Sequence, residues 1–87
     1  MKYRIEYLRD AKKSLVGIGR SDRKLFGQIR EAIERLVDDP RPDGCKPLVG
    51  RDGYRIRIRE YRVIYEIDDG AVLVTVVRVG PRGSIYE

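Results

Sequence analysis

The segment Tyr54–Tyr65 alternates between two kinds of side chain, and this alternation constrains the fold more than any other feature of the chain. Successive side chains of a β-strand point to opposite faces, so the first half of the segment has one apolar face and one basic face. The apolar positions are Tyr54, Ile56 and Ile58, and the basic ones are Arg55, Arg57 and Arg59. The apolar face accounts for burial against a core. Because like charges side by side on a sheet repel, the basic face indicates an anionic partner, with nucleic acid as the first candidate.

A turn at Arg59-Glu60 predicts which residues of the next strand lie opposite the basic face. It pairs Ile58 with Tyr61, Arg57 with Arg62, Ile56 with Val63 and Arg55 with Ile64. Paired residues of antiparallel strands share a face. We therefore expect Arg55, Arg57 and Arg62 to lie together on the face that points away from the core.

The last strand is expected to follow a two-residue turn, because Asp69-Gly70 is a strong hairpin sequence. This turn pairs Ile67 with Val72, Tyr65 with Val74 and Val63 with Val76. The same register places Arg78 on the core side, near the end of the strand. Both hairpins independently assign the same face to the core, and this agreement favours the arrangement.

The N-terminal part of the chain predicts a strand and then a short helix. Residues 2–8 alternate between apolar and polar side chains, as a half-buried strand does. Asp10 is expected to be the N-cap of the short helix, whose apolar residues recur at spacings of four and three. Gly17 and Gly19 are expected to end it.

A second, longer helix is expected to be capped by Ser21, to carry an apolar stripe with a period of 3.6 residues and to end before Pro40. A loop over residues 39–53 follows, with Leu48 and Val49 expected to anchor it to the core. Three strands come next, at about 53–59, 61–68 and 71–79. The element order β-α-α-β-β-β predicts an α+β fold, with a helical hairpin packed on one face of a small, largely antiparallel sheet.

Composition limits the chemistry that this chain can perform. Its 87 residues predict a single domain, 1–87. Cys45 is the only cysteine and histidine is absent, so an intramolecular disulfide is excluded, a zinc site is disfavoured and no cofactor is expected. A general base would have to be Asp, Glu, Tyr, Lys or the substrate itself. No signal peptide or membrane-spanning run is visible, so a cytoplasmic location is the default expectation.

The basic face suits a phosphodiester. The net charge of +5 agrees with an anionic partner. Guanidinium groups bind phosphate oxygens in a bidentate way and stabilise the charge that gathers there during transfer. Arg82 follows the last strand and Tyr86 lies four residues further on, where nearby arginines would lower its pKa and make it a better base. The alternative is structural, because charged residues on a sheet also serve solubility and prevent aggregation.

Five sequence segments give the chain a family resemblance. They are Asp39-Pro40-Arg41-Pro42, Lys46-Pro47-Leu48-Val49-Gly50, Tyr54-Arg55-Ile56-Arg57, Tyr61-Arg62-Val63-Ile64-Tyr65-Glu66-Ile67 and Val77-Arg78-Val79-Gly80-Pro81-Arg82. With the predicted element order, they make essentially the whole chain resemble the RelE/ParE superfamily of toxins from type II toxin–antitoxin systems, and RelE-type messenger-RNA interferases in particular.

The resemblance implies a ribosome-dependent endoribonuclease that cuts messenger RNA in the ribosomal A site through attack of the 2′-hydroxyl on the adjacent phosphate, without a metal. Arg55 and Arg57 would hold the RNA backbone. Arg62 and Arg82 would stabilise the charge on the phosphate, and Tyr86 would be the base. Some relatives carry lysine at the positions of Arg55 and Arg57, and many carry histidine or lysine where this chain has Pro81, so the role of general base shifts toward Tyr86 here.

The resemblance also implies partners and leaves two other functions open. The partners would be an acidic, RelB-like antitoxin that lays an amphipathic helix on the toxin, together with the ribosome and messenger RNA. One alternative is a ParE-like protein that binds DNA gyrase and does not cut RNA. The other is an inactive relative that only binds an antitoxin.

Overall fold

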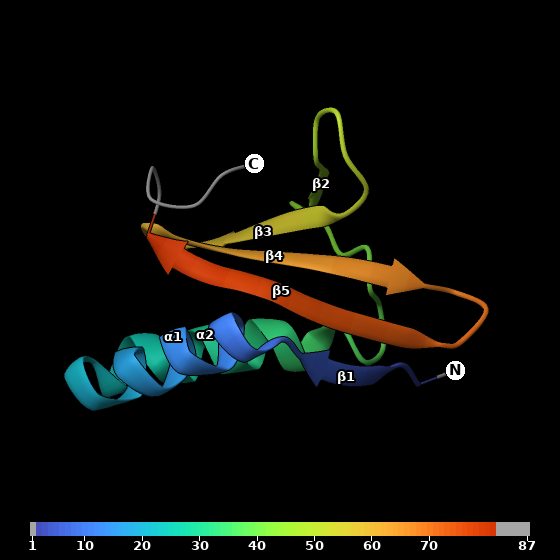
Figure 1. Ribbon diagram of the computed structural model, residues 1–87. Helices are drawn as coiled ribbons and strands as arrows, with labels where there is room; N and C mark the ends of the chain where they lie inside the picture. Colours follow the sequence, from blue (N-terminus) through green and yellow to red (C-terminus); the bar gives the residue numbers. More distant parts are fainter. Residues whose placement is uncertain (1, 82–87) are drawn as a thin grey trace.

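The computed structural model describes residues 2–81, which form two helices and a five-stranded sheet (Figure 1). The elements are β1 (Arg4–Tyr7), α1 (Arg9–Ser21), α2 (Arg23–Arg35), β2 (Lys46–Pro47), β3 (Tyr54–Ile58), β4 (Tyr61–Asp68) and β5 (Leu73–Pro81). The strand order is β1-β5-β4-β3-β2, with β1 parallel to β5 and all other neighbours antiparallel. Both helices lie on the same side of the sheet (Figure 1). The predicted α+β fold is confirmed, and the short strand β2 is an element that the sequence did not predict.

The core lies between the helices and the sheet. The apolar stripe of α2 and the turn after it contributes Ile29, Ile33 and Leu36, and the sheet contributes Val63, Tyr65, Val74 and Val76; all of these are fully buried. Burying a side chain of this kind stabilises the fold by roughly 1.5–3 kcal/mol. Since β4 and β5 supply the sheet side of this core, their alternate residues must point to the opposite face.

Helix α1 corrects two predictions. Leu8 occupies its N-cap position without a side-chain hydrogen bond, and Asp10 lies in the first turn, where its charge favours the helix dipole. The helix also continues through Gly17 and Gly19 to Ser21. A Cβ atom at Gly19 would lie 3.3 Å from the Phe26 ring, so this glycine allows a close approach of α2 and does not end the helix.

The cap of α2 is Asp22 and not Ser21. The backbone N–H of Leu25 donates to Asp22 Oδ1 over 3.0 Å, as an N-cap carboxylate requires. The Ser21 hydroxyl donates back to the carbonyl of Gly17 in α1. Ser21 therefore completes the first helix, and the cap moves one residue along the chain.

The β3–β4 register is the predicted one in every pair, from Tyr54 opposite Tyr65 to Ile58 opposite Tyr61. The β4–β5 register is not. The connection is a four-residue turn, 69–72, in which Asp68 Oδ1 accepts from the Ala71 N–H and Val72 has a φ of 53°. Val72 is therefore a turn residue and not part of the core.

A β-bulge changes the pairing further along β5. Tyr65 lies opposite Val76 but Ile64 lies opposite Arg78, so Val77 is an extra residue on β5. Beyond the bulge, Val79 lies opposite Val63 and is buried in the core. The prediction that Arg78 lies on the core side is therefore wrong: Arg78 is exposed and shares the face of Ile64.

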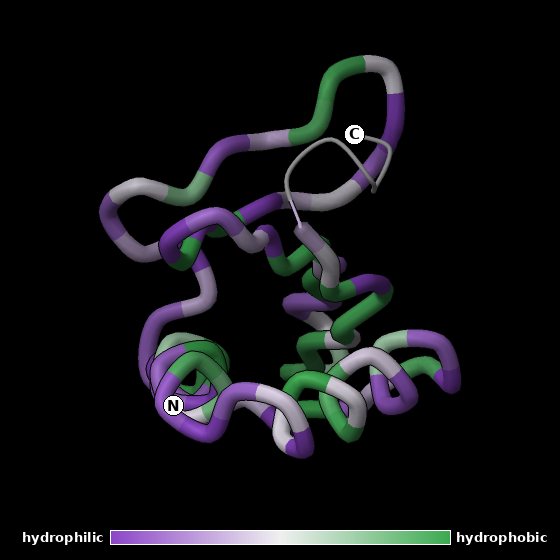
Figure 2. The backbone as a smooth tube through the Cα atoms, turned by 90° about the vertical axis from the view of Figure 1, so that its left-hand side faces the viewer, coloured by the Kyte–Doolittle hydropathy of each residue, from purple (hydrophilic) through white to green (hydrophobic). Residues whose placement is uncertain are grey.

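The loop between β2 and β3 stands out from the body of the protein, with a short hydrophobic stretch between hydrophilic ones (Figure 2). Leu48 is 8% exposed, but it lies outside the core cluster between the helices and the sheet, and Val49 is 89% exposed. The prediction that both residues anchor the loop to that core is therefore wrong, although Leu48 is buried. The Leu48 N–H donates to the carbonyl of Gly53, which closes the loop. The loop therefore rises beside the face of the sheet that the helices leave uncovered.

Candidate nucleic-acid interface

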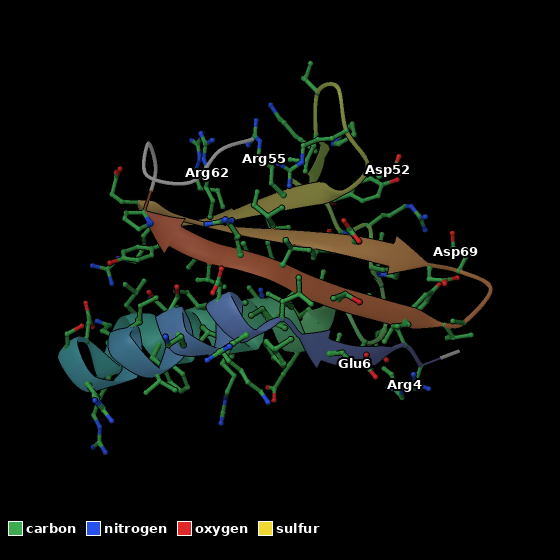
Figure 3. The ribbon with its side chains drawn as sticks, viewed as in Figure 1. Arg4, Glu6, Asp52, Arg55, Arg62 and Asp69 are labelled. Atoms are coloured by element: carbon green, nitrogen blue, oxygen red, sulfur yellow. The ribbon has the colours of Figure 1, made fainter. Side chains whose placement is uncertain are left out.

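Four arginines share the sheet face opposite the helices, and we call this group the arginine face: Arg55, Arg57, Arg62 and Arg78. Arg57 is paired with Arg62 across β3 and β4. Ile64 lies between Arg55 on β3 and Arg78 on β5. Figure 3 shows Arg55 and Arg62 on the side of the sheet away from the helices. The structure therefore brings together the predicted residues Arg55, Arg57 and Arg62.

The four arginines differ in exposure. Arg62, on the central strand β4, is only 8% exposed, and Gly80 lies opposite it on β5. Arg55 is half-buried, whereas Arg57 and Arg78 are exposed. Because charges interact more strongly where water is excluded, solvent screens the charge of Arg62 less than the charges of Arg57 and Arg78.

Arg78 is the member of this face that the sequence reasoning missed. Simple alternation from the Asp69-Gly70 turn assigned it to the core side. One signal argued against that assignment, since an arginine in an apolar core needs a partner for its charge. The bulge resolves the conflict by turning Arg78 out and Val79 in. The other two predicted site residues, Arg82 and Tyr86, lie outside the described residues.

Beyond the arginine face, the same side of the sheet holds a groove of about 680 Å³ toward the β4–β5 turn. Its walls include the loop between β2 and β3 and the ends of β4 and β5. We call it the acidic groove after its carboxylates, Asp52, Glu66 and Asp68. The uncovered face of the sheet thus has a basic part and an acidic part.

A cluster of polar side chains closes the outer end of the groove. Arg41 donates to both carboxylate oxygens of Asp69, at 3.3 and 2.8 Å, and to the Tyr54 hydroxyl at 3.2 Å. The Tyr3 hydroxyl donates to Asp69 Oδ1 over 2.7 Å. These hydrogen bonds, first from Arg41 and then from Tyr3, hold the pKa of Asp69 below its ordinary value. The cluster joins the N-terminus, the loop after α2 and the β4–β5 turn.

Tyr65 is unsuited to acid–base chemistry. Burial raises the pKa of its hydroxyl, which donates to the carbonyl of Pro40 over 2.8 Å. Burial also raises the pKa of Tyr7.

Within residues 2–81, no group of three Asp, Glu or Cys side chains could hold a metal ion.

The helical side carries a second groove, of about 440 Å³, with an almost entirely apolar lining. It runs between α1, α2 and β1, and we call it the helix groove; its lining includes Tyr7, Leu15, Val16, Phe26 and Ile33. Val16 is 54% exposed although it is a large aliphatic residue.

Of the helices that the structure describes, none has the length and apolar character needed to cross a membrane.

Comparison with known proteins shows the family. Residues 5–86 match the family described as "ParE toxin of type II toxin-antitoxin system, parDE". The chain is 33% identical over 66 residues to the mRNA interferase toxin RelE of Escherichia coli strain K12, a match that covers 69% of this chain and 70% of that protein. The chain therefore belongs to the RelE/ParE superfamily of toxins from type II toxin–antitoxin systems.

Solved structures agree with this assignment. The intact RelBE toxin–antitoxin complex of E. coli contains a chain that is 28% identical, with a TM-score of 0.76 and coverage of 91% of this chain and 95% of that one. The archaeal RelE–RelB complex from Pyrococcus horikoshii OT3 contains a chain with a TM-score of 0.78 over 98% of this chain and 100% of that one. At 24% identity, the archaeal likeness concerns the fold alone.

Proposed function

We propose that this toxin is a metal-independent endoribonuclease that cuts messenger RNA in the ribosomal A site. The observation that carries the proposal is the pair of Arg57 and Arg62, with Arg62 buried on the central strand, on the sheet face opposite the helices. A face that serves only solubility gains nothing from burying a guanidinium, since charged groups prefer water. The E. coli relative is named an mRNA interferase toxin, and this name supports the same proposal.

In the proposed reaction, the 2′-hydroxyl oxygen attacks the adjacent phosphorus, its proton passes to a base, and the bond to the 5′-oxygen of the next nucleotide breaks. The products are a 2′,3′-cyclic phosphate and a 5′-hydroxyl, which takes up a proton. Arg62 and Arg82 stabilise the charge on the five-coordinate phosphate. Arg55, Arg57 and the newly found Arg78 hold the neighbouring backbone. Tyr86 serves as the base.

We also propose that the chain binds a cognate antitoxin. The chains in the E. coli and archaeal complexes are bound to antitoxins named in those structures. The helix groove, with its apolar lining and exposed Val16, suits the apolar face of an amphipathic helix. The net charge of +5 favours an acidic partner.

The decisive experiment expresses Arg62→Ala and Arg82→Ala in cells and maps messenger RNA ends by primer extension. Cleavage at A-site codons by the unaltered toxin, lost in both variants together with growth arrest, is the expected result. Arg23→Ala is the matched control, because it removes one exposed arginine from the first turn of α2. Full toxicity of both variants would overturn the proposal.

The family description names ParE, so inhibition of DNA gyrase is the second candidate. It predicts intact messenger RNA together with broken or unsupercoiled DNA in the same cells. Absence of any growth effect, with antitoxin binding retained, would indicate an inactive relative.

A further inference from the structure

The uncovered sheet face changes from basic to acidic along β4. Residues 62, 64 and 66 of this strand share a face, so Glu66 lies on the same side of the sheet as Arg62. Four residues of strand separate the two by about 13 Å, and a single RNA strand can contact both. Figure 3 shows Asp52 on this side as well, toward the β4–β5 turn.

The acidic groove has an apolar part and a hydrogen-bonding part. Leu48 and Leu73 provide the apolar part. Glu66 provides a carboxylate, and its cross-strand partner Thr75 provides a hydroxyl. Within residues 2–81, the Glu66 carboxylate makes no hydrogen bond or ion pair, and its residue is exposed. Such a combination of apolar surface and a few polar groups is typical of a ligand site.

Charge decides which part of an RNA the groove accepts. Arg41 is engaged by Asp69, so Arg51 is the remaining cation of the lining against Asp52, Glu66 and Asp68. A phosphate would be repelled from this groove and attracted to the arginine face. A base is uncharged, and the amino groups of adenine, cytosine and guanine donate hydrogen bonds that a carboxylate accepts. Uracil has no amino group and places two carbonyl oxygens beside its single N–H.

We propose that the acidic groove binds the base of a nucleotide next to the scissile phosphate, and that Glu66 selects bases with an amino group. This inference rests on the proposed RNA cleavage. It adds a specificity site to a face that otherwise binds only the sequence-independent backbone. Continuity with the arginine face favours RNA over a lysine or arginine side chain of a protein partner, since Glu66 and Arg62 share one face of β4.

A binding experiment tests the groove without requiring cleavage. The purified toxin is titrated with single-stranded oligo(A), oligo(C), oligo(G) and oligo(U) at one salt concentration. We expect oligo(U) to bind about fivefold or more weakly than the other three. Glu66→Ala should remove this difference, and Glu66→Gln should shift it toward oligo(U), because an amide N–H can donate to a uracil carbonyl. Glu60→Gln is the matched control, since Glu60 is exposed in the β3–β4 turn, outside the groove.

The possible results separate the two proposals. Equal binding of the four oligonucleotides, or a preference that Glu66→Ala leaves unchanged, would overturn the base site even if the toxin cuts messenger RNA. A preference that depends on Glu66 in a protein that cuts no RNA would retain the base site and reject the proposed reaction. Binding of an oligo-lysine peptide that depends on Glu66, without any preference among bases, would assign the groove to a protein partner and overturn the inference.

If the toxin cuts, the same variants are compared on ribosome-bound messenger RNAs with randomised A-site codons. The unaltered toxin and Glu60→Gln should share one distribution of cut codons. Glu66→Gln should raise the share of codons with uracil at one fixed position by about fivefold. An identical distribution for all three proteins would contradict the inference.

Discussion

Arg57 and Arg62 lie directly opposite each other on β3 and β4, and of the two only Arg62 is buried. The guanidinium of Arg62 therefore lies where water is largely excluded, whereas the charge of Arg57 is screened by solvent. This difference predicts different tolerance to lysine, which keeps the charge and loses the planar, forked donor.

Arg62→Lys should lower the rate of messenger RNA cleavage by about 10²–10³-fold, because a donor positioned in a water-excluded site is lost. Arg57→Lys should retain most of the activity, since an exposed point charge still attracts the backbone. Single-turnover cleavage of ribosome-bound messenger RNA measures both, and thermal unfolding checks that the variants fold. Equal loss in the two variants would contradict the division of roles.

Arg78→Ala should weaken RNA binding by a similar factor for every base sequence, because a backbone contact carries no sequence information. The slope of log K against log salt should decrease by about 0.7, the value for one contact to a single strand. Fluorescence anisotropy at several salt concentrations provides the measurement, with Arg23→Ala as the control of equal charge. An unchanged slope would mean that Arg78 makes no contact with RNA.

Arg78 also marks the limit of what the sequence could predict. The β3–β4 register was predictable in full because the two-residue turn Arg59-Glu60 leaves only one pairing. The β4–β5 register was not, because the turn has four residues, with the Ala71 backbone N–H donating to Asp68 Oδ1, and a bulge then absorbs Val77. The hydrogen bond is local to the turn and the bulge belongs to the pairing of β4 with β5, and period-two alternation contains neither. The predicted faces of the residues near the turn were still correct. Tyr65 pairs with Val76 instead of Val74, and a shift of two residues keeps each side chain on its predicted face.

The candidate site was predictable to the extent that it follows from alternation. Arg55, Arg57 and Arg62 share the predicted face. The burial of Arg62 was not predictable from alternation, which assigns a face but not an exposed fraction. The acidic groove was not predictable because the loop between β2 and β3 forms part of its wall. This loop, residues 48–53, contains Gly50 and Gly53, and a loop with two glycines has too many conformations for its path to be read from residue order.

Val16→Asp should weaken antitoxin binding by tenfold or more, because it places a charge in the apolar lining of the helix groove. Val49→Asp is the matched control: it makes the same substitution at a valine that is 89% exposed in the loop between β2 and β3. Isothermal titration with the antitoxin provides the comparison. Equal weakening by the two substitutions, or none by Val16→Asp, would exclude the helix groove as the docking site.

Two glycines of α1 should respond in opposite ways to alanine. Gly17→Ala should raise the free energy of unfolding by about 0.5–1 kcal/mol, because its new methyl group meets no atom within 4 Å and alanine favours the helix. Gly19→Ala should gain less or lose stability, because its methyl group would lie 3.3 Å from the Phe26 ring. Urea unfolding of both variants makes the comparison. A larger gain for Gly19→Ala would contradict the close helix packing.

The cluster around Asp69 should make stability depend on pH in acid. Hydrogen bonds from Arg41 and Tyr3 lower the pKa of Asp69 in the folded protein, so the unfolded chain binds more protons as the pH falls through the range between the two pKa values. The stabilisation is then fully present above the unfolded value, about 3.9, and is lost as the pH falls toward the folded value. Asp69→Asn should be less stable at neutral pH and should lose less stability below pH 4.

Asp43→Asn is the matched control, since Asp43 is exposed in the loop after α2. Urea unfolding from pH 7 to pH 2.5 should give this control the same acid dependence as the unaltered protein, while Asp69→Asn gives a flatter curve. Hydrogen exchange should also rise in the loop after α2 when Asp69 is replaced, because Arg41 and Tyr3 both lose their shared acceptor. Parallel curves for all three proteins would show that the cluster adds no stability, as is common for exposed ion pairs.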